Sequence, residues 1–420
     1  MKKNSVLLNK WFVLFLLSAS AGLIYQLPYL RYTFYDPMLN TFGYTNIQLG
    51  TLMSVYGIGS CICYVLGGFL ADRFPSKYLI SSGQVLTGLG GFLFATIPAY
   101  GVALAISFFW AFTTSLIFWP TLINYVRSLG TAGEQGRMYG LLEGLRGIVS
   151  TAAGLVLVAV FHHFAAEAAG LKTVIILYAV INIVLGILAF FVIPYEKKEA
   201  VSESGEKASV VQSFVTALKM PEAWLVTIAI FATMTCFICL GYLTPYLTGV
   251  MGATAAFAAT VGTIRTWGLQ VVGGTTGGFI ADKIHSSSLT MVFAFVIITA
   301  GFGVMAVMPG SPGFLMAATI FMFVFGAAIY VNRGVYFATL TEAGVPASMN
   351  GVVVGFASAV GFLPDAFMYT VIGNWLDNYE PATGYRMIFI CGCVSALAGL
   401  LASALMYKNS RKKATAAGPD

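Results

Sequence analysis

Charged side chains are scarce in this chain: Asp, Glu, Lys and Arg together make up 9% of its 420 residues. Soluble globular domains carry about 25% charged residues, so an ordinary water-exposed surface is excluded. Histidine occurs three times, which leaves little material for a His-based metal or acid–base site. Apolar side chains stand in their place, at 58% of the sequence and a mean hydropathy of +0.85. This composition is typical of a chain that is solvated mainly by lipid.

Long apolar runs fill most of the sequence. Each reaches the ~20 residues that a helix needs to cross a bilayer, and their glycines and prolines are tolerated where neighbouring helices satisfy the backbone. The sequence therefore predicts an all-α, polytopic membrane protein with twelve transmembrane helices. The predicted spans are 11–34, 46–71, 78–98, 101–126, 137–161, 172–194, 222–248, 254–281, 288–308, 312–340, 347–375 and 384–407.

Lysine and arginine are divided unevenly between the two ends of the spans. Of the 22, four lie deep within spans and two, Lys172 and Arg386, lie at the outer ends of their spans on one side, which leaves sixteen on the other. Basic residues collect on the cytoplasmic side, so both termini are predicted to be cytoplasmic, as in a bacterial-type inner membrane protein. The net charge of +6 is then a sign of topology, and a nucleic-acid partner is not indicated.

A polar stretch over 195–220 divides the spans into two sets of six. Its Ser, Gly, Glu and Lys content indicates a solvated cytoplasmic linker, and the apolar spacing over 208–219 predicts a short interfacial helix within it. The predicted organisation is a six-helix bundle over 1–194, this linker, a second six-helix bundle over 221–408 and a cytoplasmic tail over 409–420.

Two short sequences recur half a chain apart. Gly67–Arg73 (Gly-Gly-Phe-Leu-Ala-Asp-Arg) returns as Gly277–Lys283 (Gly-Gly-Phe-Ile-Ala-Asp-Lys), an offset of 210 residues. Tyr25–Leu30 returns as Tyr242–Leu247 around a shared Tyr-x-x-Pro-Tyr-Leu pattern. An internal repeat in an apolar chain is a common construction of transporters, which bind their solute between the two halves.

The six cysteines all fall within predicted spans. Cys236-x-x-Cys239 has the spacing of a zinc-binding pair, but a structural zinc site needs four ligands, and we expect no His or second cysteine pair at a matching level. Apolar packing is therefore the expected role, and no metal is predicted.

Arginines inside the spans are the strongest sign of function, because a charge near the bilayer centre costs about 2.5–3.5 kcal/mol on insertion scales. Arg265 lies eleven residues past Thr254, roughly 16 Å along a helix that rises 1.5 Å per residue. Its counterpart in the first half is Val55, so the repeat did not require an arginine here. Arg31 in span 1 and Arg333 in span 10 are further candidates.

These arginines predict an anionic substrate, because guanidinium groups hold carboxylates and phosphates by paired hydrogen bonds and keep their charge when buried. Aromatic and amide side chains would add stacking and hydrogen bonds. The candidate substrate-binding residues are Arg31, Arg265, Arg333, Tyr25, Tyr29, Tyr242, Trp119, Trp267 and Asn332. The alternatives are core or lipid packing for each aromatic residue, and an ion pair with Asp365 or Glu143 for Arg265.

Acidic residues inside the spans are candidates for a proton carrier or for an ion pair. Glu143 and Arg146 are three residues apart in span 5, so they face the same side of a helix and could neutralise each other. Asp365 follows Pro364 in span 11 and is the second candidate.

The chain resembles the major facilitator superfamily along its whole length, in its two sets of six spans, its cytoplasmic middle loop and a motif between spans 2 and 3. In that family the motif reads Gly-x-x-x-Asp-Arg/Lys-x-Gly-x-Arg/Lys. The matching residues here are Gly68, Asp72, Arg73 and Lys77, and in the second copy Gly278, Asp282 and Lys283. The chain departs from the family at Pro75 and Ser76, where Gly and a base are usual.

The resemblance implies a mechanism as well as a fold. Spans 1, 4, 7 and 10 would line a central cavity, with spans 2, 5, 8 and 11 completing its walls, and the protein would be a monomer. The two bundles would rock about the substrate, and the turns at Asp72 and Asp282 would latch the cytoplasmic side, where a carboxylate can face the positive N-terminus of a neighbouring helix.

The expected function is secondary active transport of a small organic anion such as a carboxylate, sugar acid, sulfonate or phosphate ester, by proton symport or anion exchange. The chain also resembles the organophosphate:phosphate antiporters in its span 1 arginine and Asp-Arg turn. Those carriers are expected to hold a second arginine in span 7, which this chain lacks, and Arg265 is the candidate replacement. No cofactor and no enzyme activity are predicted. The alternative is export of a neutral or amphipathic compound, with structural arginines.

Overall fold

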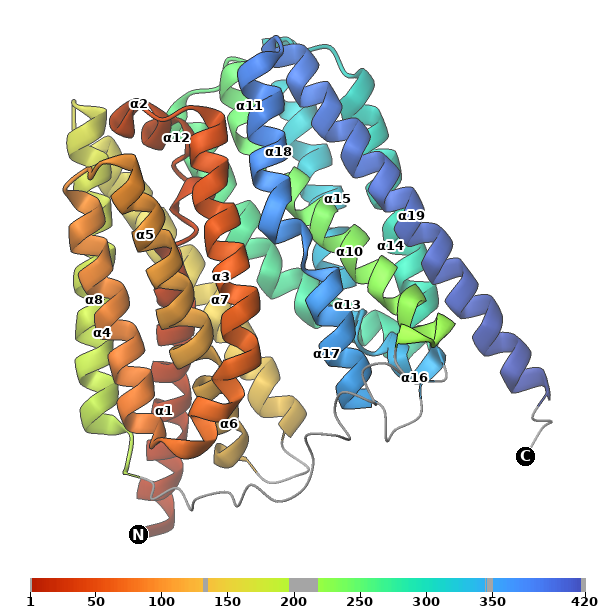
Figure 1. The fold of residues 1–420 in the computed structure, drawn as a ribbon, viewed down its shortest axis with the longest axis horizontal. Coiled ribbons are helices and arrows are strands. Elements are labelled where there is room, and N and C mark those ends of the chain that lie inside the picture. Colours follow the sequence, from red (N-terminus) through yellow and green to blue (C-terminus); the bar gives the residue numbers. More distant parts are fainter. Residues whose placement is uncertain (1, 131–134, 196–217, 344, 346–349, 417–420) are drawn as a thin grey trace. The chain divides into compact units, whose positions relative to one another are not determined.

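Helices and their connections make up the whole described part of the chain, in which there is no β-strand (Figure 1). The computed structural model describes residues 2–130, 135–195, 218–343, 345 and 350–416. The all-α prediction is confirmed. The linker predicted over 195–220 and its interfacial helix over 208–219 lie almost entirely outside the described residues.

The first six predicted spans each fall on one helix or on consecutive helical elements. Short helices α2 (Tyr35–Phe42) and the 3-10 turns η1 (Ile24–Gln26) and η2 (Leu30–Tyr32) follow the first of them. The others are α1 (Lys2–Leu23), α3 (Asn46–Arg73), α4 (Ser76–Ala95), α5 (Tyr100–Ala111) with η3 (Phe112–Phe118) and α6 (Trp119–Leu129), α7 (Gln135–His162) and α8 (Glu167–Val192).

The last six spans follow the same rule. They correspond to α10 (Pro221–Gly241) with α11 (Leu243–Gly249), α12 (Ala255–Thr263) with η5 (Ile264–Gly268) and α13 (Leu269–Ile284), α14 (Ser287–Val307), η6 (Pro312–Phe314) with α15 (Leu315–Val335) and α16 (Thr339–Ala343), α17 (Asn350–Gly361) with α18 (Pro364–Asn378), and α19 (Pro381–Ala416). Within the described residues, nine helical segments are long and apolar enough to cross a membrane.

The helices gather into two compact units. The first comprises Met1–Ser202 together with Thr254–Val271, and the second comprises Glu203–Ala253 together with Val272–Asp420. The segment Thr254–Val271, which carries Arg265, therefore packs with the helices of the first unit. The domain boundaries drawn from the sequence repeat remain a prediction.

Packing inside each unit repeats in the other. In the first unit α4 packs against α8 and α1 against α7; in the second α14 packs against α19 and α10 against α17. These are spans 3 with 6 and 1 with 5, and then spans 9 with 12 and 7 with 11. Small residues permit the close approach, since a Cβ added at Gly399 would overlap the ring of Phe295. The internal repeat of the sequence is thus also a repeat of helix packing.

The repeated Tyr-x-x-Pro-Tyr pattern lies where spans 1 and 7 interrupt their helices. In span 1 the helix α1 ends at Leu23 and the chain continues through the short turns η1 and η2. In span 7 the helix α10 ends at Gly241, and α11 begins after Tyr242. Proline lacks the N–H that would bond to the carbonyl four residues earlier, and the break begins at that earlier residue in both spans: Ile24 before Pro28, and Gly241 before Pro245.

Amide side chains from two other helices stabilise the break in span 1. Gln84 of α4 donates to the Ser20 carbonyl at 2.9 Å, and Asn182 of α8 donates to the carbonyls of Leu23 at 3.3 Å and of Tyr178 at 2.8 Å. Backbone groups freed inside a membrane must be satisfied by protein. Two buried amides therefore supply what the interrupted helix lacks.

Candidate functional site

Three tyrosines at the break in span 1 form a stacked column in the first unit. The ring centroids of Tyr25 and Tyr29 are 6.0 Å apart and those of Tyr29 and Tyr32 are 5.5 Å apart, with interplanar angles of 23° and 26°. The Tyr56 ring from α3 meets Tyr29 edge-on at 5.4 Å. We call Tyr25, Tyr29 and Tyr32 the tyrosine column. It joins two predicted substrate residues to Tyr32, which the sequence reasoning did not select.

Arg265 lies at one end of the tyrosine column and is 2% exposed. Its guanidinium carbon is 5.6 Å from the ring centroid of Tyr32, and one of its nitrogens donates to the Tyr32 carbonyl at 3.4 Å and to the Thr266 hydroxyl at 3.0 Å. The residue belongs to η5, a turn of π-helix between α12 and α13. Such wide turns occur often at functional sites. Arg265 is therefore held inside the first unit and does not face lipid.

Arg146 lies at the other end of the column. Its guanidinium carbon is 5.2 Å from the ring centroid of Tyr25 and 5.0 Å from that of Trp119, and these two rings meet edge-on at 6.0 Å. The expected pair with Glu143 is present, with distances of 3.1 and 3.3 Å to the two carboxylate oxygens. Cationic groups thus bracket the tyrosine column at both ends.

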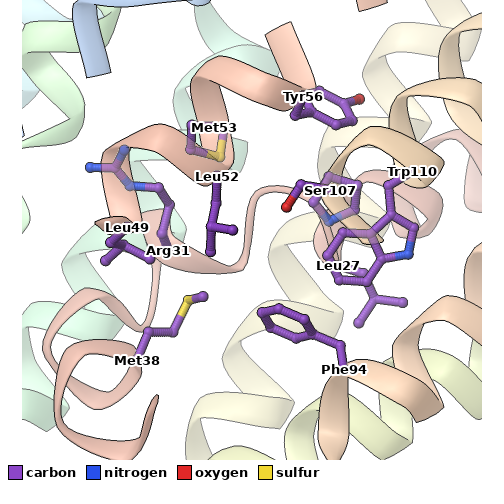
Figure 2. A pocket seen from close by; sticks show the side chains of 11 residues that line it. Leu27, Arg31, Met38, Leu49, Leu52, Met53, Tyr56, Phe94, Ser107 and Trp110 are labelled. Carbon is purple, nitrogen blue, oxygen red and sulfur yellow. The ribbon is translucent and has the colours of Figure 1, made fainter. Parts of the chain in front are cut away.

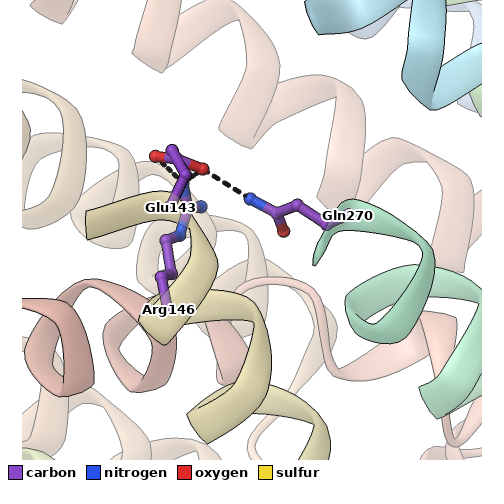
Figure 3. A network of polar contacts seen from close by, with 3 residues as sticks. All are labelled: Glu143, Arg146 and Gln270. Carbon is purple, nitrogen blue, oxygen red and sulfur yellow. Dashed lines mark hydrogen bonds and ion pairs between the residues drawn. The ribbon is translucent and has the colours of Figure 1, made fainter. Parts of the chain in front are cut away.

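Glu143 has a second partner that sequence reasoning did not anticipate. Gln270 at the start of α13 donates its amide N–H to Glu143 Oε2 at 2.8 Å, as Figure 3 shows. The carboxylate therefore joins Arg146 on its own helix to the segment that carries Arg265. Of the two partners predicted for Arg265 as alternatives to a substrate, Glu143 is engaged by Arg146 and Gln270.

Arg31 is 3% exposed and lies with its guanidinium carbon 5.0 Å from the ring centroid of Tyr35. Its stem borders a narrow pocket, part of it open to solvent, among α2, α3, α4 and α5. The guanidinium points away from Phe94 and Trp110 (Figure 2). The other lining residues are mostly apolar: Leu27, Pro28, Met38, Leu49, Leu52, Met53, Tyr56, Phe94, Ser107 and Trp110.

Span 4 contributes hydroxyl groups where the sequence shows mainly phenylalanine. The segment η3 is a second π-helical stretch, and its Thr114 exchanges a hydrogen bond of 2.9 Å with the Tyr56 hydroxyl. Ser115 donates to Ser60 of α3 at 2.9 Å. The spacing of Thr and Ser in the sequence did not indicate that these hydroxyls share one face. A π-turn changes the number of residues per turn, so the 3.6-residue period of an α-helix does not apply here.

Trp267, by contrast, lies in the apolar core of the first unit. It belongs to one hydrophobic cluster with Leu17 of α1, Leu122 of α6 and Leu142 of α7. The same cluster also holds the aromatic residues Tyr25, Phe118 and Tyr125.

The second unit gathers Arg333, Asn332, Asp365 and Tyr242 of the predicted site. The guanidinium carbon of Arg333 is 4.3 Å from the ring centroid of Phe237 and 5.5 Å from that of Tyr330. The half-buried carboxylate of Asp365 lies within reach of both the Arg333 charge and the Tyr369 side chain. A guanidinium and a carboxylate thus lie together within this unit.

Two other predicted residues of the second unit, Tyr242 and Asn332, differ in their hydrogen bonding. The Tyr242 hydroxyl, at the break in span 7, donates to the Tyr369 carbonyl at 3.1 Å. Asn332 is fully buried, and neither atom of its amide has a hydrogen-bond partner among the described residues. Burying an amide without a partner is costly, so Asn332 is suited to bind a polar group that is not part of the chain.

The motif turns are described only in part. The side chains of 64–69 and of Asp72 lie outside the described residues. The role of Gly68 and Asp72 in a cytoplasmic gate therefore stays a prediction. Arg73 is exposed, and Lys77 lies with its ammonium 4.3 Å from the ring centroid of Phe190. In the second copy, Gly277–Lys283, both Asp282 and Lys283 are exposed.

A different carboxylate occupies the helix N-terminus beside the second motif. Glu342 of α16 accepts hydrogen bonds from the Ser286 hydroxyl at 2.9 Å, from the Ser288 N–H at 3.1 Å, and from the Ser287 N–H and Ser288 hydroxyl. The N-terminus of α14 carries partial positive charge, which favours an anion there. Sequence reasoning missed this residue because the repeat directed attention to Asp282.

No cluster of three or more His, Cys, Asp or Glu side chains that could hold a metal ion occurs in the described part of the chain. One expectation about the cysteines was wrong, however. The Cys236 thiol donates to the Gly392 carbonyl of α19 at 3.4 Å, so Cys391 and Cys393, on either side of Gly392, do reach the level of Cys236-x-x-Cys239.

Comparison with known proteins agrees with this architecture. The family model described as Major Facilitator Superfamily matches residues 11–368. Two inner membrane proteins of Escherichia coli (strain K12) align over nearly the whole chain: YqcE is 32% identical over 415 residues (98% of this chain, 97% of the relative), and YihN is 33% identical over 414 residues (96% and 97%).

Solved structures share the fold at low sequence identity. A bacterial homologue of the human lysosomal transporter Spinster, in an inward-facing and unoccupied conformation, matches with a TM-score of 0.73 at 15% identity, covering 96% of this chain and 97% of that one. The nucleoside transporter NupG matches with a TM-score of 0.76 at 14% identity, covering 95% and 100%. Together with the helical repeat and the family match, these likenesses identify the chain as an integral membrane transporter, not an enzyme, that belongs to the Major Facilitator Superfamily.

Proposed function

We propose that this transporter carries a small organic anion by alternating access. The observation that supports the proposal most strongly is Arg265, an arginine deep in span 8 that is buried against the tyrosine column, on a π-turn, at a position where the repeat has Val55. A permanently charged group in this setting is costly. Bidentate recognition of a carboxylate, sulfonate or phosphate is the chemistry for which guanidinium is suited.

The remaining predicted groups have separate roles in this proposal. Arg146 and Tyr25, at the far end of the column, place a second cation on the same row of rings. In the second unit, Arg333 and Asn332 offer a cation and an amide with unsatisfied hydrogen-bonding capacity. Asp365, which feels the charge of Arg333, is the proposed proton carrier for symport.

Location and topology complete the proposal. The distribution of Lys and Arg supports cytoplasmic termini, and the relatives YqcE and YihN are named inner membrane proteins. We infer that this chain acts as a monomer in the same kind of membrane and that the cytoplasmic side is latched through the motif turns. The carboxylate of Glu342 at the α14 N-terminus is a further candidate for that latch.

The pocket beside Arg31 favours a second candidate function. Its lining of leucine, methionine and aromatic side chains would suit an amphipathic or neutral compound. In that case the buried arginines would stabilise the fold without contacting the solute, and the protein would export its solute from the cell.

A thermal-shift comparison of matched solutes separates the two. Purified full-length protein is heated with pairs that differ mainly in charge, such as gluconate and glucitol, or glycerol phosphate and glycerol. Because a ligand that binds only the folded state raises the melting temperature, the anion proposal expects stabilisation by at least one anion and none by its neutral partner. Stabilisation by neutral or amphipathic compounds alone would favour export.

A further inference from the structure

The last helix of the protein is longer than a membrane crossing requires. α19 comprises 36 residues, Pro381–Ala416, and at a rise of 1.5 Å per residue it is about 54 Å long. A helix of ~20 residues suffices to cross the ~30 Å hydrocarbon core of a bilayer. Because the apolar part of α19 ends near Met406, its C-terminal turns extend beyond the hydrocarbon.

One face of α19 carries a continuous row of exposed apolar side chains. Its members are three or four positions apart, which is the spacing that places residues on one side of a helix. They are Ile390, Val394, Leu397, Leu401 and Leu405. Exposed apolar side chains gathered on one surface mark a contact with the membrane, so this row is the lipid-facing side of the helix.

The row continues into cations where the apolar part ends. Lys408 and Lys412 follow Leu405 by three and seven positions, so they extend the same face, and Arg411 adjoins them on the helix surface. All three basic side chains are exposed. We call Lys408, Arg411 and Lys412 the basic end of α19. Its positive charge therefore lies on the side of the helix that contacts lipid.

Tyr407 indicates the level of the basic end in the membrane. Arg411 Nε donates to the Tyr407 hydroxyl at 3.1 Å, and the guanidinium carbon is 5.6 Å from the ring centroid. Tyrosine is enriched at the membrane–water interface. Lys408 lies about 4.5 Å and Lys412 about 10.5 Å beyond Leu405 along the axis. The headgroup layer is about 5–8 Å thick on each side, and flexible lysine stems can reach into it from its outer edge.

Effects within the helix do not account for these three cations. The sequence of α19 contains no Asp or Glu, so no acid on the same helix neutralises them. The helix dipole favours cations only within the last turn, and the basic end precedes that turn. Lys408 and Lys412 are four positions apart, where like charges destabilise a helix. An anion from outside the helix would stabilise this arrangement.

We propose that the basic end of α19 binds the phosphate headgroups of anionic phospholipids in the leaflet that it adjoins. Lysine attracts a phosphate as a point charge, and arginine can hold two of its oxygens. An acyl chain that lies along the apolar row brings its own phosphate to the level of Lys408. A lipid therefore matches both parts of the surface, whereas a soluble anion or an acidic protein segment matches only the cations. This binding is independent of the solute that the protein carries.

Hydrogen exchange of the full-length protein in two kinds of nanodisc tests the proposal. The nanodiscs contain phosphatidylglycerol or phosphatidylcholine with the same acyl chains, so they differ in headgroup charge. Peptides from 402–416 report on the amides of the basic end. We expect their exchange to be slower by about fivefold or more in phosphatidylglycerol, which is the factor for one cation at an anionic surface. The difference should shrink at about 1 M salt, where charges are screened. Equal exchange in both nanodiscs would overturn the proposal.

Matched variants test whether the cations are responsible. Lys408→Gln/Lys412→Gln should lose most of the difference between the nanodiscs. The control Lys172→Gln/Lys219→Gln removes the same charge from exposed lysines outside α19 and should keep the difference. A full difference in the Lys408→Gln/Lys412→Gln variant would contradict the assignment. The comparison of the two nanodiscs with wild-type protein decides the question by itself if a variant does not fold.

Inorganic phosphate distinguishes a lipid headgroup from a free anion. The detergent-solubilised protein is mixed either with phosphate or with phosphatidylglycerol, and exchange of the same peptides is measured. We expect slower exchange with the lipid alone, because only the lipid also contacts the apolar row. Equal slowing by phosphate would show that the basic end binds free anions, and the lipid assignment would be wrong.

Discussion

Arg265 and Tyr32 are joined in two ways, because the guanidinium lies 5.6 Å from the tyrosine ring centroid while one of its nitrogens donates to the tyrosine carbonyl at 3.4 Å. The two residues are 233 positions apart in the sequence. This contact fixes the direction of the buried arginine and connects span 8 to the break in span 1. It makes the tyrosine column part of the arginine's environment.

The ring of Tyr32 should matter for transport and its hydroxyl should not. Tyr32→Phe keeps the aromatic face and the backbone carbonyl, whereas Tyr32→Ala removes the face. A buried cation–π contact contributes about 0.5–2 kcal/mol, so we expect Tyr32→Ala to weaken apparent substrate affinity by about 2- to 30-fold. Tyr32→Phe should remain close to wild type. Equal losses in both variants, measured as KM for uptake, would show that the hydroxyl is what counts.

Asn182 should contribute to stability through the break in span 1. Asn182→Ala removes donors to the carbonyls of Leu23 and Tyr178. Leaving buried carbonyls without a donor costs about 1–3 kcal/mol, so the melting temperature should fall. The matched control is Asn378→Ala, at an exposed amide on α18 that bonds to Asn374. An unchanged melting temperature for Asn182→Ala would mean that the interrupted helix does not depend on the hydrogen bonds of Asn182.

Glu342 should stabilise the N-terminus of α14. A carboxylate at a helix N-terminus contributes about 0.3–2 kcal/mol through the helix dipole, in addition to its hydrogen bonds. We therefore expect Glu342→Ala to lower the melting temperature of the purified protein. Asp282→Ala, at an exposed carboxylate in the adjacent turn, should change it far less. A larger fall in melting temperature for Asp282→Ala than for Glu342→Ala would show that Asp282, the acid of the motif, stabilises this helix end instead.

Asp365 and Glu143 should differ in proton coupling. Asp365 is half-buried beside Arg333 and Tyr369, whereas Glu143 is engaged by Arg146 and Gln270. We expect Asp365→Asn to lose uptake driven by a pH gradient while keeping solute exchange across equilibrated membranes, because exchange requires no net proton movement. Glu143→Gln should keep both activities. Gradient-driven uptake by Asp365→Asn would exclude this carboxyl as the carrier.

The sequence predicted the helical architecture well because its signals are local and strong. Apolar runs long enough to span a membrane, and a repeated motif, are visible without any three-dimensional information. The Tyr-x-x-Pro-Tyr repeat also coincides with the breaks in spans 1 and 7, since proline interrupts a helix wherever it lies in the interior.

The contacts between distant segments were the part that sequence could not supply. Tyr32 and Gln270 join the site through side-chain partners 233 and 127 positions away, a relation that no spacing rule contains. The π-turns η3 and η5 shift the exposed face of spans 4 and 8 by an amount that a 3.6-residue period does not predict.

Uptake by Arg265 variants in proteoliposomes tests the central claim most directly. The solute is the anion that most raises the melting temperature of the wild-type protein, and the control is Arg127→Ala at an exposed arginine. We predict that Arg265→Ala abolishes uptake with expression and melting temperature preserved. Arg265→Lys should recover part of it, because a point charge cannot make paired hydrogen bonds. Transport of the anion at the wild-type rate by Arg265→Ala would contradict the account.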